Sequence, residues 1–313
     1  MPAVSLKNIY KTYDKGKVKA VNDVSFDVEH GELFGLIGPD GAGKTSIFRI
    51  LTTVLLPDKG QASVEGLDTV KDYREIRNKV GYMPGKFCLY QDLTVAENLN
   101  FFATLFKTTI EENYDLIRDI YEQIKPFSNR PAGKLSGGMK QKLALCCALI
   151  HKPEVLFLDE PTTGVDVVSR KEFWEMLKRL KEQRISILVS TPYMDEATLC
   201  DRIALIQNGN ILSLETPQNI ISSFPVKLYA VKSKDIYRLL KDFRSNPAVE
   251  SCFAFGEYLH MTLRDDHDGL KILEELATQY HAEEFKAQII KPLIEDSFIR
   301  LMKEKEKATT IEK

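Results

Sequence analysis

Short apolar runs alternate with amphipathic segments along the first 220 residues of the chain. Leu33 to Ile37, Val155 to Leu158 and Ile185 to Val189 are continuous apolar runs of strand length. Such runs are typical of parallel strands that are buried on both faces. After Lys44, Ile47, Phe48, Ile50 and Leu51 recur at helical spacing and predict a helix that stops before Pro57. Further helices are expected between the apolar runs, from Gly137 to Leu149 and from Arg170 to Lys181. The alternation predicts an α/β core built on a parallel sheet.

Antiparallel strands and a helical region are expected around this core. Residues 1 to about 36 read as strands, and Val64 to Gly66 reads as another short strand. Asn208-Gly209 lies between two short apolar runs, which is a strong signal for a β-hairpin. Thr94-x-x-Glu97 fits a capping box that opens a helix, and a largely helical stretch follows to about residue 127. We therefore predict a helical subdomain at about residues 90–150.

The pattern starts again after residue 222. Strand and helix signals then follow in the order β-α-β-β-α-β, which predicts a small α+β domain of the ferredoxin-like kind over residues 223–305. Its last helix is expected from Leu293 to Met302, and the mixed-charge residues 306–313 are expected to form a flexible tail. The expected segments are Lys227 to Val231, Ile236 to Phe243, Ser251 to Phe255, Tyr258 to Leu263, Leu270 to Tyr280 and Phe285 to Ile290.

Composition narrows the class of protein. The net charge of −2 offers no electrostatic case for binding nucleic acid. No apolar run approaches the ~20 residues that span a bilayer, and the N-terminus lacks the apolar core of a signal peptide. The five cysteines form no C-x-x-C pair, so we expect free thiols in a reducing cytoplasm.

A glycine-rich segment between the first buried strand and the next helix has the spacing of a phosphate-binding P-loop. Its glycines let backbone N–H groups wrap phosphates, the lysine reaches the β- and γ-phosphates, and the threonine hydroxyl binds Mg²⁺. A chance match in an ordinary loop is the alternative, but the flanking strand and helix favour the P-loop. The segment, with the serine that follows it, is Gly38, Pro39, Asp40, Gly41, Ala42, Gly43, Lys44, Thr45 and Ser46.

Two adjacent carboxylates, Asp159 and Glu160, end the second buried strand. Asp159 is suited to hold Mg²⁺ through water, and Glu160 is suited to orient or deprotonate an attacking water. The alternative is a capping or surface pair. The strand is too apolar to end on two charges without a ligand, so we favour a catalytic pair.

A third motif, Leu135-Ser136-Gly137-Gly138-Met139, precedes a predicted helix. Ser136 is placed to cap that helix, whose N-terminus and bare backbone amides would form a second anion site. Alone this would be an ordinary cap. Between a P-loop and a Leu-Asp-Glu strand it is specific, and the chain here resembles the ATP-binding-cassette (ABC) ATPases from residue 4 to about 220.

The resemblance implies the P-loop ABC ATPase fold for residues 1–222, with a RecA-like parallel core, an antiparallel β subdomain and a helical subdomain. It also implies a head-to-tail dimer with a second ABC ATPase subunit. In this dimer the motif from Leu135 to Met139, the signature motif, closes over the ATP and Mg²⁺ held by the other subunit, and the other subunit's signature motif does the same in return. Tyr13 is then expected to stack on adenine and Asp166 to communicate across the dimer. A plain edge-strand tyrosine and a helix cap are the respective alternatives.

The C-terminal extension, including Leu293-Ile294-Glu295-Asp296-Ser297-Phe298, looks like that of drug-export ABC ATPases. This resemblance implies an exporter with a separate integral membrane subunit and a peripheral position on the cytoplasmic face of the membrane. The region from Tyr90 to Asn98 is expected to pass movement to that subunit.

Two positions depart from the family pattern. Gly85 stands where glutamine is expected after Tyr82-Met83-Pro84, and Pro192 stands where histidine is expected. Proline has neither a side-chain donor nor a backbone N–H. Loss of one transition-state donor costs about 10²–10³ in rate, so we expect a site that hydrolyses ATP poorly. In this respect the chain resembles the weaker ATPase of exporters that use two unequal cassettes, which implies a degenerate site in an unequal pair. Compensation by waters or neighbouring groups is the alternative.

The sequence thus predicts an ABC exporter ATPase subunit with a weak site of its own. One rival is an ATP-sensing regulatory ABC protein without productive turnover. Another is an ABC ATPase that acts on ribosomes or DNA, which the absence of a basic surface, a second cassette and a long insertion disfavours.

Overall fold

The computed structural model describes residues 1–86, 88–265 and 267–311. It separates into two compact units: Met1–Pro217 with the chain from Glu304 onward, and Gln218–Lys303. The last helix, α10 (Ile294–Ile311), extends beyond the predicted end at Met302. The helix thus continues through residues 306–311 of the predicted tail, whose flexibility stays a prediction, and residues 312–313 lie outside the described residues. Lysine, glutamate and alanine favour helix, and this explains the extension.

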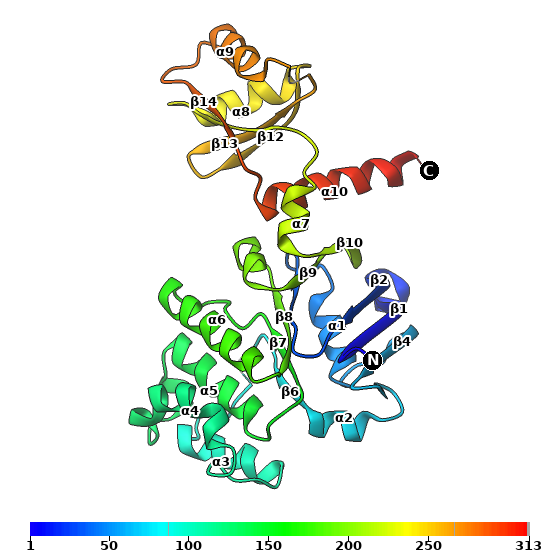
Figure 1. Ribbon diagram of the computed structural model, residues 1–313, viewed down its shortest axis with the longest axis vertical. Coiled ribbons are helices and arrows are strands. Elements are labelled where there is room, and N and C mark those ends of the chain that lie inside the picture. The colour runs from blue at the N-terminus through cyan, green and yellow to red at the C-terminus, as the bar shows by residue number, and fades with distance from the viewer. Residues whose placement is uncertain (87, 266, 312–313) are drawn as a thin grey trace. The chain divides into compact units, whose positions relative to one another are not determined.

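The first unit is built on a six-stranded sheet in the order β10-β9-β3-β8-β7-β6 (Figure 1). Neighbouring strands from β9 to β6 pair in parallel, and β10 pairs with β9 antiparallel through the predicted turn at Asn208 and Gly209. Both turn residues have positive φ, 48° and 74°, as a tight hairpin turn requires. The strands are β3 (Leu33–Ile37), β6 (Val80–Met83), β7 (Val155–Asp159), β8 (Ser186–Thr191), β9 (Arg202–Gln207) and β10 (Asn210–Glu215).

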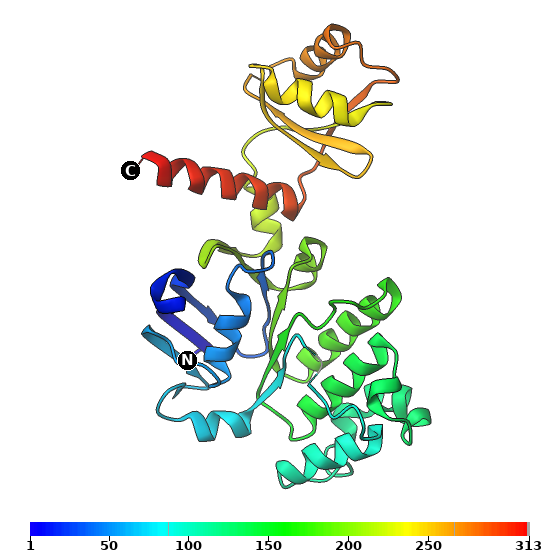
Figure 2. The ribbon, with the colours of Figure 1, turned by 180° about the vertical axis from the view of Figure 1, so that it is seen from behind.

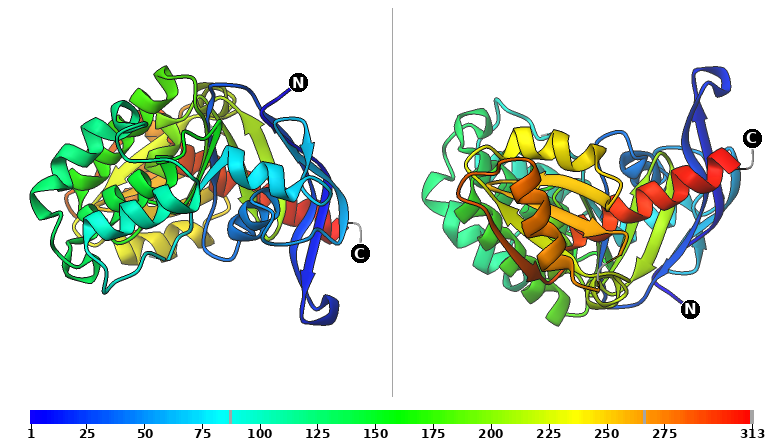
Figure 3. Two further views of the ribbon diagram at one scale, coloured as in Figure 1. Left: turned by 90° about the horizontal axis from the view of Figure 1, so that it is seen from below. Right: turned by 90° about the horizontal axis from the view of Figure 1, so that it is seen from above.

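A second sheet of this unit is antiparallel, in the order β2-β1-β4-β5. Gly66 lies in the turn between β4 and β5, so the expected strand through Gly66 in fact ends at Val64. Phe26 of β2 stacks on Phe34 of β3, with ring centroids 5.1 Å apart. One apolar core thus joins both sheets and α1. In Figure 3 the turn between β1 and β2 projects beyond these sheets. The bounds are β1 (Val4–Tyr13), β2 (Val18–Val28), β4 (Lys59–Val64), β5 (Leu67–Asp68), α1 (Lys44–Leu51) and α2 (Tyr73–Lys79).

A group of helices lies on one side of the parallel sheet (Figures 1 and 2). α3 opens with the predicted capping box: Thr94 accepts from Glu97 N, and Thr94 N donates to Glu97 Oε2. α3 and α4 both contact α5, and α5 also contacts β6 and α6. The helices are α3 (Val95–Leu105), α4 (Tyr114–Ile124), α5 (Gly137–Leu149) and α6 (Val167–Glu182), and α7 (Pro217–Ser222) follows β10.

The Gln218–Lys303 unit has the predicted β-α-β-β-α-β order. Its sheet is antiparallel throughout, in the order β12-β13-β11-β14, which is the ferredoxin-like arrangement. Tyr229, Val231, Leu259 and Met261 face α8 and α9 in a separate apolar core. The elements are β11 (Leu228–Lys232), α8 (Ile236–Ser245), β12 (Val249–Phe255), β13 (Tyr258–Leu263), α9 (Gly269–Gln279) and β14 (Lys286–Ile290).

Candidate nucleotide-binding site

Four parallel strands bring the predicted chemistry to one edge of the sheet. Because the carboxyl ends of parallel strands lie at the same edge, the segments that follow β3, β8, β7 and β6 meet there. The register aligns Ile37 with Thr191, Asp159 with Ser190, and Met83 with Leu158. Along this edge, the P-loop follows β3 and the Thr191-Pro192 segment ends β8. The paired carboxylates lie at the end of β7, and Gly85 follows β6.

The P-loop wraps tightly against its surroundings. A Cβ at Gly38 would lie 2.1 Å from Ile206 O, and one at Gly43 would lie 2.1 Å from Ala20 O. Gly43 also has φ 107°, a conformation that favours glycine. Only glycine lets the backbone approach these carbonyl oxygens so closely at the two positions. The conformation of the loop before α1 therefore depends on both glycines.

Lys44 and Glu160 share the interior of the loop. Lys44 is almost fully buried, and its Nζ donates to Gly38 O at 2.8 Å and Pro39 O at 3.0 Å. Glu160 Oε1 lies 3.1 Å from the same ammonium group. The backbone of Glu160 has φ 52°, a left-handed conformation that is uncommon for a non-glycine residue and occurs disproportionately at active sites.

Asp159 is held by a serine that sequence reasoning missed. Ser190 Oγ donates to Asp159 Oδ1 at 2.6 Å and accepts from Glu160 N at 3.0 Å. Ser190 and Asp159 are both buried. One hydroxyl therefore positions both members of the carboxylate pair. The only signal for it in the sequence is a serine at the end of an apolar strand.

The two unusual residues lie beside this pair and beside the P-loop. A Cβ built at Gly85 would lie 3.0 Å from Asp159 O and 3.7 Å from Glu160 Cβ. Pro192 follows Thr191, whose carbonyl accepts from Gly38 N at 3.2 Å. Both positions are therefore next to the groups predicted to handle phosphate, and neither presents a side-chain donor to them.

Tyr13 ends β1 and is about one-third exposed, and its hydroxyl is 3.0 Å from Ser46 Oγ in α1. This contact places the ring beside the helix that follows the P-loop. Stacking on adenine stays a prediction.

Asp58 holds the end of β1 by hydrogen bonds. It accepts from Thr12 N and Oγ at 2.7 and 2.8 Å and from Lys11 Nζ at 2.7 Å. These donors lower the pKa of Asp58 to about 2, with the bond from Lys11 contributing most.

The signature motif forms a second cluster with the Asp166 loop. Ser136 caps α5 by accepting from Met139 N at 3.3 Å, while Leu135 is buried. A Cβ at Gly137 would lie 3.3 Å from Gly164 O, and one at Gly138 would lie 2.7 Å from Ser169 Oγ. Among the hydrogen bonds described for this chain, none joins Ser136–Met139 to the P-loop cluster.

Asp166 is the N-cap of α6, as the alternative interpretation held. It accepts from Val168 N at 3.1 Å, Ser169 N at 3.0 Å and Ser169 Oγ at 2.7 Å. The Ser169 N–H contributes most to holding the pKa of Asp166 below its usual range. Communication across a dimer stays a prediction.

Arg170, four residues further along α6, also escaped the sequence reasoning. Its guanidinium bonds Glu196 and Asp195, each at 3.1 Å, and lies 4.3 Å from the centroid of the Tyr193 ring. Thr191 Oγ1 donates to Glu196 Oε2 at 2.5 Å. The Thr191-Pro192-Tyr193 segment is thereby tied to the start of α6.

The site fits a nucleotide triphosphate and a magnesium ion. In the described chain, no protein acceptor takes the backbone N–H groups of Gly43, Lys44 and Thr45, so they form an anion site at the start of α1. The Thr45 hydroxyl and the Asp159 carboxylate are oxygen ligands of the kind that Mg²⁺ prefers.

No helix in the described part of the chain combines the length and apolar character needed to cross a bilayer.

Comparison with known proteins places these motifs in one family. The ABC transporter family profile matches residues 21–163. The chain is 36% identical over 303 residues to the probable multidrug ABC transporter ATP-binding protein YbhF of Escherichia coli (strain K12), covering 96% of this chain and 52% of YbhF. The chain thus spans about half the length of that relative. It is 39% identical over 204 residues to the ABC transporter ATP-binding protein NatA of Bacillus subtilis (strain 168), covering 64% of this chain and 83% of NatA.

A solved structure agrees with this placement. The dimeric post-hydrolysis structure of the ATP-binding cassette MJ0796 bound to ADP and Pi matches with a TM-score of 0.62 and 27% identity, covering 68% of this chain and 98% of that one. A drug-resistance relative, the doxorubicin resistance ATP-binding protein DrrA of Mycobacterium tuberculosis (strain ATCC 25618 / H37Rv), is 37% identical over 221 residues, covering 70% of this chain and 67% of DrrA. The P-loop, the carboxylate pair and the signature cluster, together with these relatives, establish that the chain belongs to the ABC transporter family of ATP-binding proteins.

Proposed function

We propose that this chain is the ATP-binding and ATP-hydrolysing subunit of an ABC exporter and works peripherally on the cytoplasmic face of a membrane. The observation that carries the proposal is the meeting of Lys44, Asp159 and Glu160 at one sheet edge, with Lys44 Nζ 3.1 Å from Glu160 Oε1. Relatives named as multidrug and drug-resistance ATP-binding proteins support the export role.

The residues divide the work as follows. The N-terminus of α1 and Lys44 bind the phosphates, while Thr45 and Asp159 would hold Mg²⁺, which supplies charge neutralisation there. Glu160 orients and deprotonates the attacking water. Because Lys44 also contacts Glu160, phosphate that draws the ammonium away would free this carboxylate for its task.

We infer that the subunit works in a head-to-tail pair in which its own site is the slower one. Gly85 and Pro192 present no donor to Mg²⁺, water or γ-phosphate. Ser136, Gly137 and Gly138 keep the capped helix start needed to complete the site of the other subunit. The dimeric MJ0796 cassette supports the pairing. Hydrolysis in the partner's site would then reopen a pair that ATP binding closes.

An apolar groove offers a docking place for the membrane subunit. The hollow, of about 530 Å³, has Tyr82 and Met83 of β6 and Phe102 and Leu105 of α3 in its lining. Burial and the nearby charge of Asp159 raise the pKa of Tyr82 to about 12, so its hydroxyl stays protonated. Leu105, in the lining of the same groove, is 60% exposed. We propose that a helical segment of the membrane subunit inserts apolar side chains here, close to the predicted coupling region at Tyr90 to Asn98.

The ATP-sensing alternative is favoured by the same two residues, Gly85 and Pro192. Steady-state hydrolysis separates the two functions: a regulatory protein would bind Mg-ATP without turnover whether or not a second cassette is present.

Lys44→Ala tests the nucleotide site directly. The substitution removes the charge that meets the β- and γ-phosphates, and we expect it to abolish ATP binding in a titration of the purified chain. Leu105→Asp is a matched control, because it should leave ATP binding intact while weakening coupling to the membrane subunit. Unchanged affinity in Lys44→Ala would exclude the proposed use of the P-loop.

A further inference from the structure

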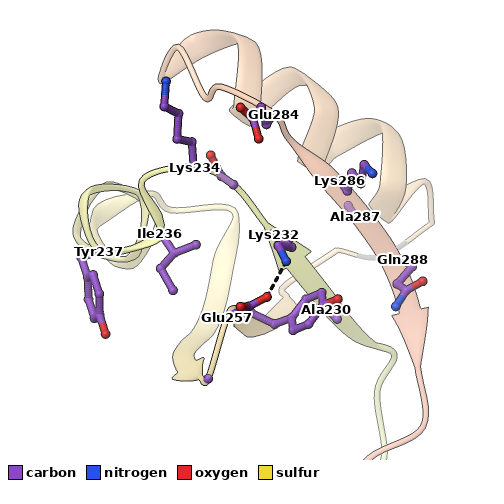
Figure 4. Close-up of a pocket in the computed structure, with 13 residues that line it drawn as sticks. Ala230, Lys232, Lys234, Ile236, Tyr237, Glu257, Glu284, Lys286, Ala287 and Gln288 are labelled. Carbon is purple, nitrogen blue, oxygen red and sulfur yellow. Dashed lines mark hydrogen bonds and ion pairs between the residues drawn. The ribbon is translucent and has the colours of Figure 1, made fainter.

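A second hollow, of about 640 Å³, opens in the Gln218–Lys303 unit (Figure 4). Its lining comes from the end of β11, the start of β14, the start of α8 and the turn between β12 and β13. Its volume is in the range typical of pockets for small molecules. All of its lining residues belong to this unit, so its function is separate from the nucleotide site.

Two lysines face each other across the floor of this hollow. Lys232 of β11 pairs in register with Lys286 of β14, so the two side chains leave the same face of adjacent antiparallel strands. Like charges directly opposite each other destabilise a sheet. A sheet that keeps such a pair violates a local rule, and such violations are expected at functional sites.

Two carboxylates that line the hollow, Glu257 and Glu284, offset part of the charge of this pair, and the charge of Glu284 acts on Lys232. Glu257, in the turn between β12 and β13, accepts from Lys232 Nζ at 2.5 Å, and the dashed line in Figure 4 marks this contact. The Glu257 side chain is 77% exposed, and an exposed ion pair of this kind adds little stability. Among the described residues, Lys286 has no ion-pair partner. The hollow therefore holds an ammonium group ready for an anion and a carboxylate that can give way to one.

Neighbouring groups suit a flat organic body. Tyr258 is 39% exposed, and Lys232 Nζ lies 5.4 Å from the centroid of its ring. In the next pair of the register, Ala230 faces Gln288, and the small alanine leaves depth while the amide offers a donor and an acceptor. Aromatic rings favour stacked or edge contacts with other rings, which Tyr258 can provide.

We propose that this hollow binds a small organic anion with a flat apolar body, and that Lys286 and Lys232 hold its acidic group while Tyr258 packs on its ring. Binding displaces Glu257 from Lys232. The C-terminal unit then serves as a ligand-sensing domain, a role that does not depend on ATP turnover.

The test is a fluorescence titration of the full chain, without nucleotide, using anilinonaphthalene sulfonate as the aromatic anion. Lys286→Gln should weaken binding at this site about tenfold, the lower end of what a lost charge-assisted hydrogen bond costs. Glu257→Gln should tighten it by about two- to fivefold, because the competing carboxylate is gone. Lys271→Gln, the same change at an exposed position of α9 outside the hollow, should leave affinity unchanged.

Two control measurements separate loss of the acidic-group contact from loss of apolar binding or of folding. Uncharged phenylnaphthylamine should bind the wild type and Lys286→Gln equally, since it also enters apolar grooves elsewhere but lacks the acidic group. Denaturant unfolding should show that Lys286→Gln folds normally. Equal affinity of Lys286→Gln and wild type for the sulfonate would overturn the proposal. Weaker sulfonate binding in Glu257→Gln would also overturn it, because this carboxylate would then support binding and not compete with the anion. Lysine-dependent binding only to anionic phosphatidylglycerol vesicles would overturn it too, by assigning the lysines to lipid headgroups.

Discussion

Restoring the missing glutamine at position 85 is the sharpest test of the degenerate site. Gly85 lies against the end of β7, where an added Cβ would approach Asp159 O to 3.0 Å and Glu160 Cβ to 3.7 Å. A glutamine there would carry its amide beside the carboxylate pair. The first of these distances is short enough that the loop has to move by a few tenths of an ångström, so Gly85→Gln brings both a donor and a steric cost.

The size of each effect can be separated. One transition-state donor contributes about 10²–10³ in rate. Overpacking a close contact costs about 1–3 kcal/mol, and Gly85→Ala has this cost without the amide. We therefore expect Gly85→Ala to hydrolyse ATP no faster than wild type, and Gly85→Gln to exceed Gly85→Ala by at least about tenfold. Adding Pro192→His should raise turnover further, but less than the product of the two gains, because groups acting on one transition state are not additive.

The assay is steady-state release of phosphate from Mg-ATP over a range of protein concentrations, since two copies must pair for turnover. The chain bearing Glu160→Gln in the Gly85→Gln, Pro192→His background is the control, and its activity should fall to background. A wild-type rate in the ordinary transporter range of about 1–10 s⁻¹ would refute the reasoning. Equal rates for Gly85→Gln and Gly85→Ala would show that the amide does not act as proposed.

Three further outcomes follow from the site. In a reconstituted complex with a complete second cassette, Ser136→Arg should stop hydrolysis while Glu160→Gln should have a much smaller effect; the reverse order would make this chain's own site the productive one. Ser190→Ala removes a hydrogen-bond donor from the buried carboxylate of Asp159. It should lower the free energy of unfolding by about 1.5–3 kcal/mol in a denaturant titration. An unchanged free energy of unfolding would show that this hydrogen bond is not needed for stability. The stability that Asp58 adds is present above its unfolded pKa of 3.8 and should be lost as the pH falls toward 2, because its folded pKa is the lower one; Asp58→Asn should flatten this part of the pH dependence of unfolding.

Much of the nucleotide site could be predicted from sequence, because each motif lies within a short stretch and follows a recognisable strand. Apolar runs located β3, β7 and β8, and parallel pairing then placed their ends together. The signature helix start at Ser136 was equally local, since a capping serine and two glycines are adjacent in the chain. The ferredoxin-like order of the second unit followed from alternating strand and helix signals and the turn at Gly256.

The features that sequence reasoning missed depend on contacts between distant segments. Ser190 contacts Asp159 only because β7 and β8 are neighbours in register. The opposition of Lys232 and Lys286 likewise follows from pairing between strands more than fifty residues apart. β6 and α2 were also not expected, because β6 has only four residues and includes Gly81, which weakens a strand signal. Helix propensity was underestimated in α10, where alternating lysine and glutamate read as a tail.

Intrachain contacts connect the surface offered to a partner with this chain's own switch segment. Gly138 packs against Ser169, which donates to Asp166 at the start of α6. Arg170, which follows Ser169 and lies one turn after Asp166, binds Glu196. Glu196 in turn accepts from Thr191, the residue before Pro192. The helix start that would complete a partner's site is thus joined through one short stretch of α6 to the segment that would meet γ-phosphate in its own site. In the proposed pair, this connection would pass a change in the position of α6 from the chain's own nucleotide site to its partner, and that would not require fast hydrolysis. The proposal thus gives a physical reason for a slower member to keep Lys44, Asp159 and Glu160.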